Sequence, residues 1–159
     1  MYEKIMVAVD GSASSKQALA EAVKVALAGD THVSVVYVVD KSVLFTYAGR
    51  VDPHAFVEEM RDDGIKVLRE AEQIIALAGA KGEAELVETD GIGEDVAERL
   101  QRYVKEHRID LAVVGTHGRR GIRRVLLGSV AERFLRGATC PVLLIRGDAA
   151  EVPAAAAAA

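Results

Sequence analysis

The chain has 159 residues, of which 50% are hydrophobic and 28% charged, and its formal net charge is -4. This size and composition are typical of a single globular domain and exclude a disordered or fibrous chain. The negative charge argues against broad nucleic-acid or membrane-surface binding, which needs a basic face. No apolar run reaches the roughly 18 residues of a membrane span.

The N-terminal stretch MYEKIMVAVD enters a strand-like apolar run at once, without the pattern of an export signal. The single cysteine, Cys140, cannot build a disulfide framework and has no Cys or His neighbour at metal-ligand spacing. We therefore expect a cytoplasmic protein.

Five short apolar runs predict strands, and the one around residue 85 is the weakest. They cover residues 5–9, 33–39, 84–87, 111–114 and 142–145. The strong runs are nearly continuous rather than alternating, which is typical of parallel strands that are buried on both faces.

Four stretches with helical spacing of apolar residues lie between these strands. They contain Leu19 to Ala26, Met60 to Ala78, Val96 to Val104 and Val130 to Leu135. The resulting βαβαβαβαβ order predicts an α/β fold: one doubly wound, five-stranded parallel sheet with strand order 3-2-1-4-5 and helices on both faces. The domain spans residues 1–147, and the Ala-rich tail, residues 148–159, is left out of it as a low-complexity end.

In such a sheet a ligand binds beyond the carboxyl ends of the strands where the winding reverses, between the first and fourth strands. Asp10 and Gly115 follow these two strands. The Asp10 carboxylate suits a ribose hydroxyl, a metal ion or a simple turn, and these alternatives stay open. Ser12 is expected to be the N-cap of the first helix.

The segment GTHGRRGIRRVLLGS, residues 115–129, combines four glycines, four arginines and His117. Its glycine backbone and the start of the fourth helix predict an anion site. Ser129 either donates its hydroxyl to that anion or forms a capping box with Glu132, and the two roles are compatible. We expect one or two of the four arginines, Arg119 among them, to contact the ligand. No P-loop motif occurs, and Gly91-Ile92-Gly93 is best explained as a strand-to-helix turn.

These residues resemble the nucleotide-binding branch of the universal stress protein family, whose phosphate motif is G-x2-G-x9-G-[ST]. Gly115, Gly118, Gly128 and Ser129 match it, and the stretches IMVAVDGS, YVVD and ATCPVLLIR extend the likeness over nearly the whole chain. The resemblance implies an adenine nucleotide alpha hydrolase-like fold and bound ATP, with Mg²⁺ or Mn²⁺ as candidate ions. The nucleotide contacts it implies are Val9, Asp10, Val38, Gly115, His117, Gly118, Gly128, Ser129 and Val130.

Three functions remain open at this point. The first is a regulatory module of the stress response that binds ATP. The second is a slow ATP hydrolase or phosphotransferase, for which only Asp10 and His117 are suitably placed. The third is an interaction protein that does not need nucleotide. Phe45 and Tyr47 either line the base or pack on a partner subunit, and their spacing favours neither role.

The two edges of the predicted sheet differ in charge. Glu83, Glu85 and Glu88 flank one edge strand, whereas the other, Val142 to Ile145, is apolar. An uncharged edge strand invites pairing with another chain. We therefore expect a homodimer through this strand, as the family resemblance also implies.

Overall fold

A computed structural model describes residues 1–118 and 127–147 of the chain. Its sheet has five parallel strands in the order β3-β2-β1-β4-β5, which confirms the predicted fold class and strand order. The strands are β1 Lys4–Ala8, β2 His32–Val39, β3 Lys81–Glu88, β4 Leu111–Gly115 and β5 Val142–Ile145. The helices are α1 Ala13–Gly29, α2 Pro53–Ala78, α3 Val96–His107, α4 Ser129–Gly137 and the short 3-10 helix η1 Lys41–Phe45.

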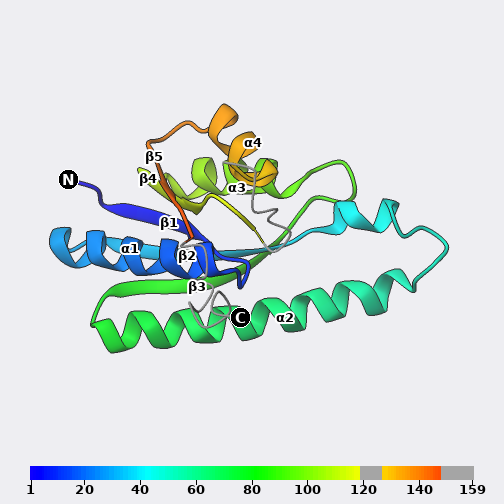
Figure 1. Cartoon of the computed structure of the whole chain (residues 1–159), viewed down its shortest axis with the longest axis horizontal. Helices are drawn as coiled ribbons and strands as arrows, with labels where there is room; N and C mark the ends of the chain where they lie inside the picture. The colour runs from blue at the N-terminus through cyan, green and yellow to red at the C-terminus, as the bar shows by residue number, and fades with distance from the viewer. Residues whose placement is uncertain (119–126, 148–159) are drawn as a thin grey trace, which may run out of the picture.

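Helices cover both faces of the sheet, with α1 and α2 on one side and α3 and α4 on the other (Figure 1). Alternate residues of the central strands face opposite sides, so Ile5 and Val7 join one hydrophobic core and Met6 the other. All three side chains are fully buried. This double burial explains why the central strands are continuously apolar in the sequence.

Local capping interactions set most helix boundaries. Ser12 is the N-cap of α1 and its side chain accepts a hydrogen bond from the Ser15 backbone, as predicted. Asp95 and Glu98 form a capping box at the start of α3. The Gly91–Gly93 stretch precedes that box as part of a strand-to-helix turn, as expected.

The cap of α4 differs from the prediction, although the helix begins at Gly128-Ser129 as expected. Gly128, not Ser129, is the N-cap, and no side-chain capping bond forms there, so the expected Ser129–Glu132 capping box is wrong. Gly128 has the extended conformation of an N-cap residue, and its backbone N–H donates a 2.6 Å hydrogen bond to the Thr116 carbonyl. Ser129 therefore becomes the first helical residue.

The edge strand β3 is twice the predicted length and pairs with β2 at eight positions, from Lys81 to Glu88. Ala84 and Leu86 of β3 are partly buried on the face that α2 covers, whereas Val87, near the carboxyl end of the strand, is buried in the core on the opposite face. Gly64 lets α2 come close, since a Cβ there would lie 2.6 Å from the Tyr37 ring. Within the described part of the chain, no helix is long and apolar enough to cross a membrane.

Candidate functional site

The candidate site lies where β1 and β4 end side by side in the middle of the sheet. The two strands pair from Ile5 with Leu111 to Val7 with Val113. After β1 the chain turns to α1 on one face, whereas α4, which follows β4, packs on the other face. This divergence is the topological switch at which doubly wound sheets bind ligands.

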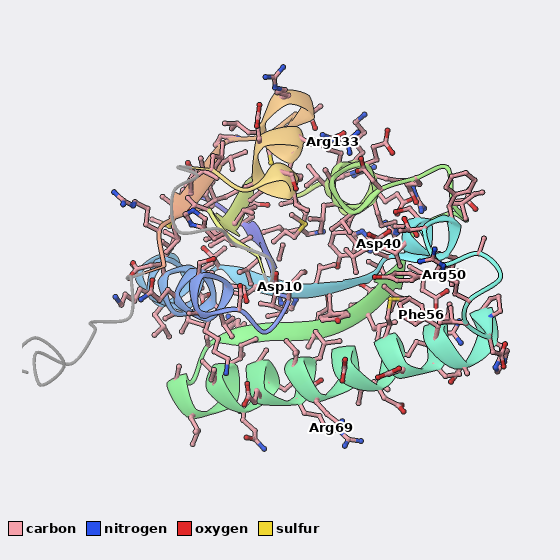
Figure 2. All side chains as sticks on the ribbon, turned by 45° about the vertical axis from the view of Figure 1, so that its right-hand side comes forward. Asp10, Asp40, Arg50, Phe56, Arg69 and Arg133 are labelled. Atoms are coloured by element: carbon pink, nitrogen blue, oxygen red, sulfur yellow. The ribbon has the colours of Figure 1, made fainter. Side chains whose placement is uncertain are left out.

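Asp10 occupies the tight turn between β1 and α1. Its carboxylate accepts a 2.9 Å hydrogen bond from the Ser12 backbone, and its own N–H donates to the Ser15 hydroxyl at 3.3 Å. Gly11 between them has φ +84°, a conformation that favours glycine. These bonds fix the half-buried Asp10 carboxylate beside the start of α1, where Figure 2 shows it.

The turn after β4 lies directly against Asp10. A Cβ added to Gly118 would stand 2.9 Å from Asp10 Oδ2, so the Gly118 backbone passes the carboxylate without a side chain between them. Upstream, the buried Thr116 hydroxyl lies 2.9 Å from His117 Nδ1. The structure thus brings three predicted site residues, Asp10, His117 and Gly118, into one place.

Gly128 joins the start of α4 to the same turn. Besides its bond to the Thr116 carbonyl, its Cβ position would be 2.9 Å from that oxygen and 3.8 Å from the Gly118 nitrogen. Ser129 and Val130 form the exposed first turn of α4. The positive end of the helix dipole therefore lies beside the Gly118 amide, which is an arrangement that favours an anion.

The remaining predicted contacts lie at the ends of neighbouring strands or beyond the described ranges. Val9 is buried after β1 and donates its N–H to the Val36 carbonyl at 2.9 Å. Val38 is half-buried near the end of β2. Arg119 falls in 119–126, outside the described residues. Within the described ranges, no three His, Cys, Asp or Glu side chains gather as a metal site.

Sequence reasoning missed Ser14, which is 4% exposed in the first turn of α1. Its hydroxyl donates a hydrogen bond to the His117 carbonyl, and the His117 N–H donates to the same hydroxyl at 3.3 Å. The one hint in the sequence is Gly115, where any side chain would overlap Ser14. Ser14 and His117 are 103 residues apart, so their contact produces no local pattern in the sequence.

The aromatic side chains after β2 occupy different settings. Phe45 in η1 is 75% exposed, whereas the Tyr47 ring packs on Phe56 of α2 with 5.5 Å between centroids. Figure 2 shows Phe56 in the first turns of α2, at the end of the molecule where Asp40 leaves β2. Tyr47 is therefore engaged within the chain, and neither role expected for the two aromatics is tested.

A charged cluster holds the segment after β2 against the end of β3. Glu88 binds Arg61 of α2 and Lys41 of η1, each at 2.5 Å. These hydrogen bonds, that of Arg61 above all, lower the pKa of the Glu88 carboxyl to about 2. Glu88 was expected to be a charge on an open sheet edge, and instead it fastens α2 and η1 to the carboxyl end of the sheet.

The five-stranded parallel sheet, with its strand order and its helices on both faces, gives the chain an α/β nucleotide-hydrolase-like fold. A model of the universal stress protein family matches residues 1–146 of the chain. Universal stress protein YxiE of Bacillus subtilis is 33% identical over 153 residues, covering 92% of this chain and 100% of that protein. The chain belongs to the universal stress protein family.

Solved structures agree with this assignment. A universal stress protein family member from Burkholderia pseudomallei is 39% identical with a TM-score of 0.75, covering 91% of this chain and 96% of that one. Two further structures are described as nucleotide complexes, each 26% identical: a universal stress protein with cAMP (TM-score 0.69, covering 92% and 98%) and one from Archaeoglobus fulgidus with dAMP (TM-score 0.65, covering 91% and 98%).

Proposed function

We propose that this protein binds an adenine nucleotide, ATP above all, in the crevice between β1 and β4 and acts as a nucleotide-dependent regulatory module of the stress response. The observation behind the proposal is the convergence of the Asp10 carboxylate, the bare Gly118 backbone and the N-terminus of α4. A ribose hydroxyl suits the first group and a phosphate suits the other two. The family members in complex with cAMP and dAMP support the same ligand class.

The nucleotide would lie along the carboxyl ends of three strands. We assign the base to the apolar ends of β1 and β2 at Val9 and Val38, and the ribose to Asp10. The phosphates would then meet backbone N–H groups of the β4 turn and the first turn of α4, which include Gly115, His117, Gly118, Gly128, Ser129 and Val130. Arg119 would add a positive charge near the phosphates.

A divalent ion, Mg²⁺ or Mn²⁺, would enter this site with the nucleotide rather than ahead of it. Asp10 is the one carboxylate that we assign to the crevice, and phosphate oxygens would complete the coordination of such an ion. Slow ATP hydrolysis remains a second candidate activity. For that reaction, Asp10 and His117 would have to orient the attacking water.

We also propose that the chain is one domain, residues 1–147, which pairs with a second copy along β5. Leu143 is 36% exposed there, and Val130 and Leu135 of the neighbouring α4 are 39% and 44% exposed. Such apolar side chains on and around an edge strand favour self-association. We further propose that the protein is cytoplasmic, as expected from the sequence.

The test is a calorimetric titration of the purified protein with ATP, ADP, AMP and cyclic AMP, with and without magnesium. Asp10→Asn keeps the shape of the side chain but loses its charge, so it should weaken ATP binding about tenfold, the scale of one charge-assisted hydrogen bond. Asp62→Asn, at an exposed position of α2, is the matched control. ATP affinity that is equal in the unaltered protein and a folded Asp10→Asn variant would contradict the proposal.

A further inference from the structure

Ser14 connects the first turn of α1 to the segments that follow β4 and β5. It is 4% exposed, and its hydroxyl bonds both backbone polar groups of His117. The Ser12 hydroxyl adds a 3.4 Å bond to the same carbonyl. Side chains at the start of α1 thus provide hydrogen-bond partners for the His117 backbone, which would otherwise bond to water.

Peptide geometry links this bond to the direction of the Gly118 amide. The peptide between His117 and Gly118 is trans, because the described residues contain no cis bond. In a planar trans peptide the N–H points opposite to the carbonyl. Since the His117 carbonyl is turned to Ser14, the Gly118 N–H is directed away from α1, and its nitrogen lies near Gly128 at the start of α4.

Two glycines pack closely against Ser14. A Cβ on Gly115 would overlap the Ser14 hydroxyl, and a Cβ on Gly147 would lie 2.9 Å from Ser14 Cβ. These two glycines therefore allow the end of β4 and the segment after β5 to approach Ser14 closely. Close packing of this kind can hold the His117–Gly118 peptide in the precise position that ligand recognition requires.

We propose that Ser14 is a positioning residue for phosphate recognition: its hydroxyl fixes the His117–Gly118 peptide so that the Gly118 amide faces a bound phosphate together with the N-terminus of α4. The proposal rests on the proposed nucleotide-binding function. Ser14 acts through the peptide and does not touch the nucleotide. Without its hydroxyl, the His117 N–H loses its bond to Ser14 and the His117 carbonyl is left with the longer 3.4 Å bond from Ser12, so the turn is held less firmly.

The resulting prediction separates phosphate from nucleoside. Ser14→Ala should lower the affinity for ATP about tenfold, the scale of one or two displaced hydrogen bonds, and change the affinity for adenosine less than about twofold. Ser34→Ala removes an equally buried hydroxyl from the middle of β2 and is the matched control. It should leave the ratio of ATP to adenosine affinity unchanged.

The experiment combines calorimetric titrations of the three proteins with amide hydrogen exchange in the absence of nucleotide. We expect exchange at the His117 amide to accelerate at least about tenfold in Ser14→Ala and not in Ser34→Ala. Equal losses for ATP and adenosine, or unchanged exchange at His117, would overturn the role of Ser14. Failure of the unaltered protein to bind any adenine nucleotide would instead overturn the proposed function, and this inference with it.

Discussion

At the scale of single residues, the glycines of the motif are not equivalent. The Cβ position of Gly118 meets Oδ2 at the end of the Asp10 side chain, which can shift while Oδ1 stays at the Ser12 N–H, whereas that of Gly128 meets the Thr116 backbone oxygen, which cannot move away. A side chain at Gly128 therefore disturbs the turn itself. A loss of binding in such a variant would not separate nucleotide contact from misfolding.

We accordingly predict different results for the two alanine variants. Gly128→Ala should lower the free energy of unfolding by about 1–3 kcal/mol, as expected for overpacking against backbone. Gly118→Ala should change it by less than about 0.5 kcal/mol and still weaken ATP binding, because it displaces the Asp10 carboxylate. Urea denaturation and ATP titration of both variants measure this. Equal destabilisation by the two substitutions would contradict the difference.

The Glu88 cluster predicts a pH-dependent contribution to stability. Its carboxyl has a pKa of about 2 in the folded chain, below its ordinary value of 4.5. The ion pairs with Arg61 and Lys41 therefore stabilise the fold above pH 4.5, and this contribution is lost as the pH falls towards 2.

Glu88→Gln should accordingly cost about 2 kcal/mol at pH 7 and almost nothing near pH 2. The free energy of unfolding, measured by urea denaturation across this range, tests the prediction. Glu72→Gln, at an exposed position of α2, serves as the control and should show no such trend. A pH-independent difference between Glu88→Gln and the unaltered protein would show that the glutamate stabilises by packing alone.

At the scale of elements, the strands and helices could be predicted from hydrophobic periodicity, because buried parallel strands and amphipathic helices leave distinct patterns. The cap of α4 could not, since the bond from the Gly128 N–H to the distant Thr116 carbonyl is not visible locally. The length of β3 was underestimated because its charged residues hide a strand that α2 covers on one side. The role of Glu88 was missed for a similar reason, as its partners are distant in sequence.

Helix α3 supports α4 and hence one wall of the site. Asp95, the N-cap of α3, also binds Arg133 of α4 at 2.6 Å, and Figure 2 shows Arg133 on the α4 ribbon. Asp95→Ala should lower the free energy of unfolding by about 1–2 kcal/mol, mainly through the lost cap. Asp95→Ser restores the cap without the charge and should recover most of the loss. Thermal denaturation of both variants measures these changes. Equal losses of stability in Asp95→Ala and Asp95→Ser would contradict a role for the cap.

At the scale of the whole molecule, β5 is the edge strand that we propose to pair with a second copy. The Pro141 and Ile145 carbonyls accept bonds from the β4 side, so the backbone groups of Val142 and Leu144 point away from β4. Ile145 packs into the core and is unsuitable for substitution, but Leu143 is not part of either core.

Leu143→Lys should therefore convert the proposed dimer to a monomer, because a two-fold interface would bring the two lysines together. Leu143→Ala, which adds no charge, should remain a dimer. Solution mass at micromolar concentration measures the outcome. A Leu143→Lys protein that is still dimeric would place the interface elsewhere.

The location of the nucleotide is the central claim, and amide chemical shifts of isotope-labelled protein during titration with ATP test it most directly. We predict saturable shifts at Asp10, His117, Gly118 and Ser129 at the β1–β4 crevice, with none at Thr31, at the opposite end of the sheet. Shifts that saturate but cluster away from the crevice, or no shifts at millimolar ATP, would contradict the proposed site.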